Sequence, residues 1–136
     1  MLNTKTKGGF GVCKVSERFM RLGVPVFAEL FCDSSEVDLI VIVSEKTYKI
    51  QVRTTSSKDN KAELRLQRTT PGTRNTACKV RGFSDVIDLF ALYVEDKDVI
   101  LFINKADINQ RRGITFDFSE GSKSRNAKDY MVPKFM

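Results

Sequence analysis

The chain has 136 residues, of which 41% are hydrophobic and 29% are charged, and its formal net charge is +6. This length fits a single domain over residues 1–136 with a core of its own, and the composition is typical of a soluble globular protein. We find no apolar stretch long enough to cross a membrane and no signal peptide, so we expect a cytoplasmic protein without a membrane partner.

Histidine is absent and the cysteines are few, which narrows the possible chemistry. The lack of histidine excludes Ser-His-Asp and Cys-His catalysis and nearly all zinc sites with histidine ligands. Cys13, Cys32 and Cys78 are widely spaced and indicate free thiols. Any bound metal would therefore be a hard ion held by oxygen ligands, which favours magnesium.

A helix and a strand are predicted near the start of the chain. Residues 12–22 place apolar side chains at helical spacing, and Gly23 follows as a stop. Gly8 and Gly9 are expected to break any regular element before this helix. Residues 24–31 then predict a short strand.

Residues 37–55 predict a hairpin of two strands. The first strand is apolar on both faces, which is typical of a central strand, and the second alternates. With a two-residue turn at 45–46, Asp38 lies opposite Arg53. Because side chains alternate along a strand, Asp38, Gln51 and Arg53 then share one face at one end of the hairpin.

The remaining patterns predict more strands and a short helical tail. Strands are predicted over 62–68, 86–94, 99–103 and 114–118, a helical turn over 105–110, and a basic loop over 69–82. The predicted fold is one α+β domain, with a mixed sheet of five or six strands and helices beside it.

Charge is unevenly distributed along the chain. Residues 54–81 carry seven basic residues against two acidic ones, whereas residues 82–104 are mostly acidic. The basic segment suits a polyphosphate partner through counterion release, although such residues also solvate ordinary surfaces. The candidate DNA-binding residues are Lys58, Lys61, Arg65, Arg68, Arg74 and Arg81.

Asp38 is a carboxylate in an otherwise apolar strand. Burying an unpaired carboxylate is costly, so we expect it at an exposed strand end, paired with a cation such as Arg53, or bound to a metal. The residues alone leave these alternatives open.

Several of these elements together resemble a known family. The order is a helix, a strand, a strand bearing Asp38-Leu39, and a strand ending Ile-Gln-Val-Arg-Thr-Thr. It is similar to the core of the PD-(D/E)XK nuclease superfamily, an α/β/α restriction-endonuclease-like core. More narrowly, it resembles intron-encoded homing endonucleases with an Ile-Gln-Val-Lys third motif. Further matches are Lys7-Gly8, Gly11, Gly23 and Asp88-Leu-Phe-Ala-Leu-Tyr93, so the resemblance covers most of residues 5–104.

The resemblance implies a function and a set of site residues. It implies a Mg²⁺-dependent endonuclease acting on double-stranded DNA as a homo-oligomer, a dimer or a tetramer, because cutting both strands usually needs two active sites. Asp38, Gln51 and the Val52 carbonyl would hold the ion. Arg53 would stand where the family has its catalytic lysine.

Two positions depart from the family pattern. Val12 stands where a glutamate usually follows Gly11, and arginine replaces lysine at position 53. Arginine keeps its proton near neutral pH, so Arg53 is expected to orient water and stabilise charge without acting as a base. The sequence is therefore compatible with an active endonuclease, with a catalytically altered or inactive DNA-binding pseudo-nuclease, and with a small protein-interaction domain that uses the acidic hairpin.

Overall fold

The computed structural model describes residues 4–30, 36–66, 68–70, 79–81, 86–108, 113–120 and 125–135. In chain order the elements are α1 (Thr4–Arg21), β1 (Val26–Ala28), β2 (Leu39–Val43), β3 (Lys46–Thr55), β4 (Lys61–Arg65), β5 (Arg68–Thr70), β6 (Lys79–Arg81), β7 (Leu89–Val94), β8 (Val99–Asn104), the 3-10 helix η1 (Lys105–Asp107), β9 (Gly113–Asp117), β10 (Arg125–Asn126) and the 3-10 helix η2 (Ala127–Tyr130).

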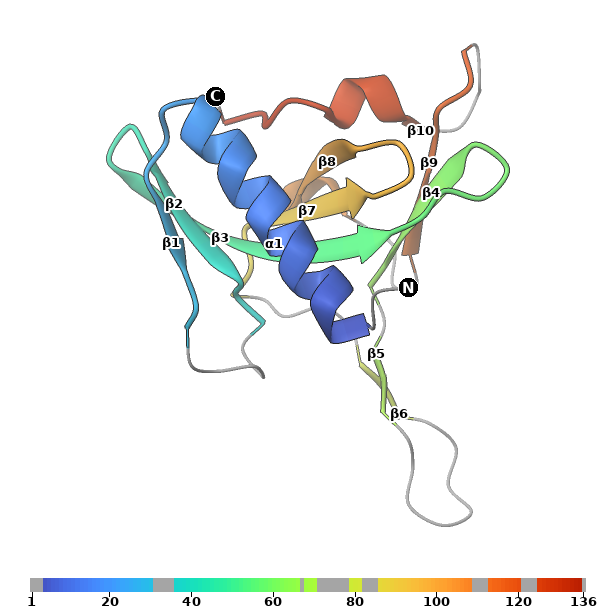
Figure 1. Cartoon of the computed structure of the whole chain (residues 1–136), viewed down its shortest axis with the longest axis horizontal. Coiled ribbons are helices and arrows are strands. Elements are labelled where there is room, and N and C mark those ends of the chain that lie inside the picture. The colour runs from blue at the N-terminus through green and yellow to red at the C-terminus, as the bar shows by residue number, and fades with distance from the viewer. Residues whose placement is uncertain are drawn as a thin grey trace.

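A five-stranded mixed sheet in the order β1-β2-β3-β7-β8 organises the fold (Figure 1). β3 and β7 are parallel, and the other neighbours in this sheet are antiparallel. Every residue of β7 is buried, because its sequence Leu-Phe-Ala-Leu-Tyr-Val is apolar on both faces. The predicted α+β class and mixed sheet are confirmed.

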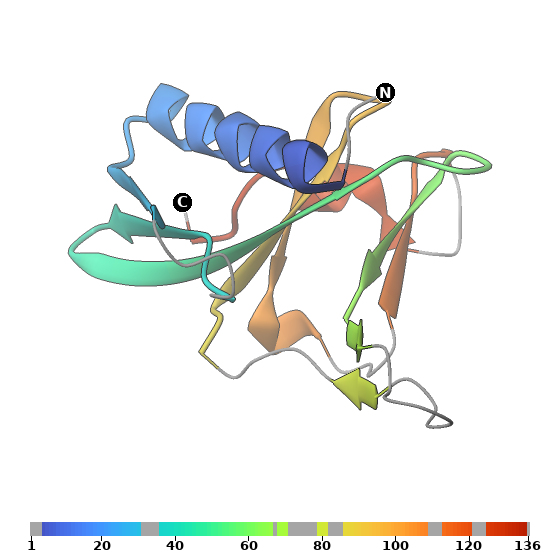
Figure 2. The same cartoon turned by 60° about the horizontal axis from the view of Figure 1, so that its bottom comes forward.

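One face of this sheet is covered by α1 (Figure 2). Val15 and Phe19 lie four residues apart on the helix, so both point to the sheet, where they pack with Leu39, Val41 and Ile50. Full burial of each such side chain contributes about 1.5–3 kcal/mol. This face is the first of two hydrophobic cores.

The opposite face is covered by strands. β4, β9 and β10 form a second sheet, with β4 and β9 antiparallel, and it packs its apolar side chains against β7 and β8 (Figure 2). The second core includes Leu64, Phe90, Leu92, Ile114 and Phe116. The 3-10 helix η2 of the predicted helical tail packs on the same core through Ala127 and Tyr130, so this layer combines strands with a short helix.

The helix α1 is longer than predicted, because it runs through Gly8 and Gly9. Tertiary contacts hold its first turns. The Thr54 hydroxyl donates to the Lys7 carbonyl at 3.3 Å, and Lys7 Nζ lies 3.3 Å from Glu95 Oε1. Such contacts outweigh the cost of about 1 kcal/mol for each glycine inside a helix.

The hairpin turn lies at Ser44 and Glu45, one residue before the predicted position. Both have positive φ, 50° and 69°, as a tight hairpin turn requires. The register is therefore shifted by two residues and the ladder ends at Leu39 opposite Ile50, so the predicted alignment of Asp38 opposite Arg53 across the hairpin was wrong. A shift of two residues leaves every side chain on its predicted face, so the hydrophobic pattern could not reveal it.

The segment 69–82 was predicted as a loop, yet part of it is paired. β5 and β6 form an antiparallel pair, with Arg68 opposite Arg81 in the backbone register. This pair projects away from the two main sheets (Figure 1). Residues 71–78 lie outside the described residues. Elsewhere in the described ranges, no helix is long and apolar enough to cross a membrane.

Candidate active site

The candidate site lies where β2 ends and β3 continues. The ladder between the two strands stops at Leu39 and Ile50, while β3 runs on to Thr55. Asp38 stands just before β2. Its backbone N–H donates to the Ile50 carbonyl at 2.9 Å, and its Oδ2 accepts the Val52 N–H at 2.7 Å. The carboxylate thus supplies a hydrogen-bond acceptor for the Val52 N–H, at a point where β3 no longer pairs with β2.

Gln51 and Arg53 lie on the same face of β3, as alternation predicts. Gln51 lies one residue beyond the last ladder pair, Leu39 with Ile50, and is 4% exposed. Arg53 follows two residues later and is partly buried. Both sit beside residues of the second core, since Gln51 pairs with Phe90 and Arg53 with Leu92.

The donor set at this point suits a hard cation. Within a strand, the N–H and C=O of one residue point to the same side, so the Val52 carbonyl faces the edge occupied by Asp38. A carboxylate, a carbonyl and the Gln51 amide are all oxygen ligands of the kind magnesium takes. In the described part of the chain, no three acidic, cysteine or histidine side chains form a metal cluster. The residues therefore fit an ion that keeps several waters or phosphate oxygens.

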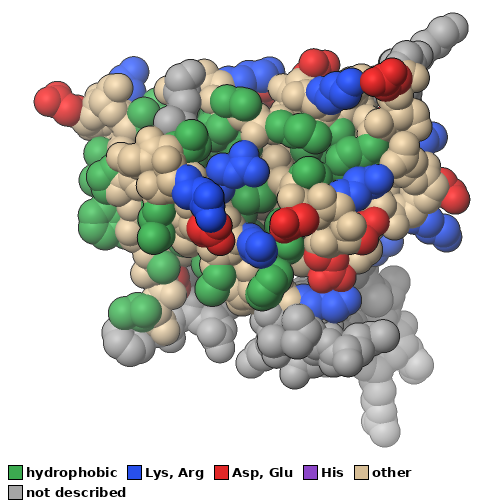
Figure 3. Space-filling model, turned by 45° about the horizontal axis from the view of Figure 1, so that its top comes forward, with side chains coloured by type: hydrophobic (Ala, Val, Ile, Leu, Met, Phe, Trp, Pro, Cys, Tyr) green, Lys and Arg blue, Asp and Glu red, His purple; other side chains and the backbone are tan. Residues whose placement is uncertain are grey.

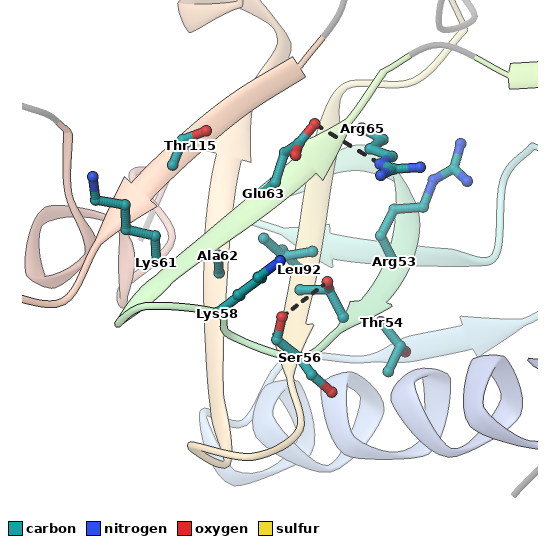
Figure 4. A pocket seen from close by; sticks show the side chains of 11 residues that line it. Arg53, Thr54, Ser56, Lys58, Lys61, Ala62, Glu63, Arg65, Leu92 and Thr115 are labelled. Atoms are coloured by element: carbon teal, nitrogen blue, oxygen red, sulfur yellow. Dashed lines mark hydrogen bonds and ion pairs between the residues drawn. The ribbon is translucent and has the colours of Figure 1, made fainter.

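A polar cavity of about 450 Å³ adjoins Arg53 (Figure 4). It lies between the second half of β3 and the strand β4, and the turn at Asp59 and Asn60 joins the two strands. Its lining residues are Arg53, Thr54, Thr55, Ser56, Lys58, Lys61, Ala62, Glu63, Arg65, Leu92 and Thr115. Four cations and four hydroxyl groups against one carboxylate make it suitable for phosphate.

Of the six candidate DNA-binding residues, Lys58, Lys61 and Arg65 line this cavity together with Arg53. The backbone of Arg68 and Arg81 belongs to the β5–β6 pair. Arg74 lies outside the described residues. Of the candidate catalytic residues, Arg53 thus meets the basic segment in this cavity, whereas Asp38 and Gln51 are not among its lining residues.

Glu63 and Thr115 are among the cavity residues that the sequence did not identify. Glu63 was counted only as an acid within the basic segment. Thr115 belongs to β9, which pairs with β4 across fifty residues of chain. The alternating pattern of β4 was the available signal for Glu63, whereas no local pattern identifies the strand partner that brings Thr115.

Val12, the first departure from the family pattern, packs at the border of the α1 core. Its neighbour Gly11 touches β3, because a Cβ placed there would lie 2.0 Å from Thr54 Oγ1 and 3.5 Å from Val52 Cγ1. Position 12 therefore adjoins Gly11, which contacts the part of β3 where Asp38 accepts the Val52 N–H.

The carboxylates of the acidic turn between β7 and β8 contact other residues of the chain. Glu95 Oε1 accepts from the Ser56 hydroxyl at 2.8 Å and lies near Lys7, and these contacts lower the pKa of Glu95. Asp96 accepts hydrogen bonds from the hydroxyl and N–H of Ser57, which lower its pKa.

The third carboxylate of this turn, Asp98, accepts from the Tyr93 hydroxyl at 2.8 Å and lies 3.4 Å from Lys14 Nζ. These contacts lower the pKa of Asp98, while burial and the bond to Asp98 raise the pKa of Tyr93 to about 12. On the face drawn in Figure 3, basic and acidic side chains are similarly interspersed. Carboxylates of this turn thus connect it to α1 and β3, and Asp96 and Asp98 are exposed.

Comparisons with known proteins agree with this geometry. A family described as PD-(D/E)XK endonuclease matches residues 2–129. Among solved structures, the chain is similar to a bacterial homing endonuclease, I-Ssp6803I, with a TM-score of 0.80 and 19% sequence identity over 95% of this chain and 88% of that chain. At this identity the likeness establishes the fold. No curated protein matches the chain.

Proposed function

Because the chain belongs to the PD-(D/E)XK endonuclease family, we propose that it is a magnesium-dependent endonuclease that hydrolyses phosphodiester bonds in double-stranded DNA. The observation that carries this proposal is the placement of Asp38. Its carboxylate accepts the Val52 N–H where β2 and β3 separate, and the next residue of β3, Arg53, lines a cationic cavity.

Asp38, Gln51 and the Val52 carbonyl are the proposed ligands of the ion. The hydrogen bond from the Val52 N–H fixes the orientation of the Asp38 carboxylate at the end of β2. When bound, magnesium supplies the Lewis acidity that phosphodiester hydrolysis requires. A single carboxylate makes a weak site, so phosphate oxygens of the substrate are expected to complete the coordination.

Arg53 is proposed to bind the phosphate that reacts. Its guanidinium keeps its charge throughout the reaction and donates hydrogen bonds, so it stabilises the charge that develops on the phosphoryl oxygens. It holds its proton too firmly to serve as a base. Lys58, Lys61 and Arg65 would hold the neighbouring DNA at the same cavity. A dimer or tetramer would supply a second site for the second strand.

Plasmid nicking tests this function. The purified chain is incubated with supercoiled plasmid in Mg²⁺, in Mn²⁺ and in EDTA, and its retention on duplex DNA is measured at increasing salt. We expect nicked plasmid with either metal, none in EDTA, and retention that falls with salt. An absence of retention at low salt would refute both nucleic-acid functions.

The second candidate, a DNA-binding pseudo-nuclease, is favoured by the apolar environment of Val12 and by the arginine at position 53. It is distinguished in the same experiment, because it predicts salt-dependent retention without any metal-dependent nicking.

A further inference from the structure

The strands β4 and β9 form a ribbon with two different faces. Along β4, exposed and buried side chains alternate, and the buried ones belong to the second core. The register places Glu63 opposite Thr115 and Arg65 opposite Gly113. The outer side, which we call the ribbon face, carries four exposed side chains: Lys61, Glu63, Arg65 and Thr115.

Phosphate binding alone does not explain a glutamate at position 63, because a carboxylate repels the DNA backbone. Folding does not explain its position either. Its Oε1 lies 3.8 Å from Arg65 Nε, and the two side chains are 52% and 82% exposed. An exposed pair at this distance contributes little to stability.

Base edges in the major groove match this mixture of side chains. Arginine and lysine donate to guanine, a carboxylate accepts from the amino group of cytosine, and threonine contacts the methyl group of thymine. The major groove also admits a two-stranded β-ribbon. We propose that the ribbon face reads base pairs in the major groove, with Glu63 as a residue that sets specificity. This inference rests on the proposed action on DNA.

The position of the ribbon face adds to this inference. Glu63 and Thr115 line the same cavity as Arg53, so the base pairs that they read lie beside the phosphate held for cleavage (Figure 4). Gly113 leaves room for the carboxylate, because a Cβ at that position would lie 3.1 Å from Glu63 Oε1. Lys58, at the start of the turn that leads to β4, lies outside the ribbon face and would contact the DNA backbone.

Selection from a pool of DNA duplexes with a randomised central segment tests this inference. The full chain binds the pool with Ca²⁺ in place of Mg²⁺, and bound duplexes are sequenced. Wild type is expected to select particular bases. In Glu63→Gln, the preference at one or more positions should change by about fivefold or more and shift toward adenine, because glutamine pairs with adenine. Total affinity should be unchanged or higher, since a repulsive charge is lost.

Two variants provide controls. Glu17→Gln makes the same substitution on the exposed side of α1, where Glu17 Oε1 lies 2.9 Å from Arg21 Nε, and should leave the base preference unchanged. Lys58→Ala should weaken binding to all sequences alike and reduce the salt slope by about one.

Each contrary outcome has a distinct meaning. If Glu63→Gln selects the same bases as wild type while both bind with the usual salt dependence, the inference is wrong and the proposed function stands. An equal change in Glu17→Gln, or a wild type that binds without any preference, also overturns the inference. If wild type retains no duplex at low salt, the proposed function fails as well.

Discussion

The carboxylate of Asp38 accepts the Val52 N–H at the point where β2 leaves β3, and it is also the proposed metal ligand. Its removal therefore has two consequences, one for the fold and one for the chemistry. Sequence reasoning located this residue because a lone carboxylate in an apolar strand needs an explanation. It could not anticipate the Val52 contact, because that contact depends on the residue at which the ladder stops.

Asp38→Asn and Asp38→Ala separate the two consequences. Asparagine keeps an oxygen that can accept the Val52 N–H, whereas alanine leaves this donor without its acceptor. We expect Asp38→Ala to lower the free energy of unfolding by about 1–3 kcal/mol and Asp38→Asn to lower it by clearly less. Chemical denaturation measures both values. An alanine variant as stable as wild type would show that the hydrogen bond is not structural.

The glycines of α1 offer a second comparison at the scale of single residues. Gly9 has no atom within 4 Å of an added Cβ, whereas a Cβ on Gly11 would lie 2.0 Å from Thr54 Oγ1. Gly9→Ala should raise the free energy of unfolding by up to about 1 kcal/mol through helix propensity. Gly11→Ala should lower it by about 1–3 kcal/mol through overpacking. The same sign for both variants in denaturant melts would disprove the contact between α1 and β3.

At the scale of elements, the sequence predicted those whose patterns are local. The apolar strands β2, β7 and β8 and the alternating strand β4 were confirmed because period and burial agree. Elements determined by distant contacts were missed or misplaced. The first turns of α1 depend on Thr54 and Glu95, and β5 and β6 depend on each other.

In the candidate site, too, features with a local pattern were predicted and features that depend on distant contacts were missed. Alternation placed Gln51 and Arg53 on one face correctly, because a period of two survives a register shift of two residues. The exact pairing was wrong because neither candidate turn contains the Asn-Gly or Asp-Gly sequence that fixes a tight hairpin. Thr115 could not be predicted, because its approach to Glu63 requires the non-local pairing of β4 with β9.

The acidic turn between β7 and β8 should make the stability of the fold depend on pH. The folded state lowers the pKa values of Glu95, Asp96 and Asp98, so their contribution to stability is complete above the unfolded values of about 4. It is lost as pH falls below about 4 and these groups take up protons. Thermal melts of wild type should therefore show a fall in Tm over this range.

Glu95→Gln is the matched variant for this prediction. It removes one titrating group that contacts Ser56 and Lys7, so its Tm should be lower than wild type at neutral pH and should depend less on pH below about 4. If the two proteins lost Tm in parallel as pH falls, the carboxylate would not stabilise the attachment of α1.

In the whole molecule, two cores enclose the central sheet, and β3 runs from its split with β2 to the cationic cavity that Arg53 lines. Metal binding at a site with one carboxylate and phosphate binding in the cavity should each strengthen the other. We expect Mg²⁺ to bind weakly to the protein alone and at least tenfold more tightly with a short duplex present, because phosphate oxygens complete the coordination. Calorimetric titration with Asp38→Asn, which lacks the proposed carboxylate ligand, as the background control measures this coupling, and equal affinity with and without DNA would contradict it.

The arginine at position 53 and the valine at position 12 define how the site differs from the family pattern. Arg53→Met removes a fixed positive charge and should lower the nicking rate by about 10²–10³. Arg53→Lys combined with Val12→Glu should raise it, because a second carboxylate and a lysine return to the edge capped by Asp38. No gain from that double change would count against the assignment of these two positions.

The role of Asp38 is tested by single-turnover nicking of plasmid DNA with wild type and Asp38→Asn, both shown to be folded and to bind duplex equally in the absence of metal. We expect Mg²⁺-dependent nicking by wild type and no rate above background for Asp38→Asn. Equal rates for the two proteins would contradict the assignment of Asp38 as the residue that holds the metal for phosphodiester hydrolysis.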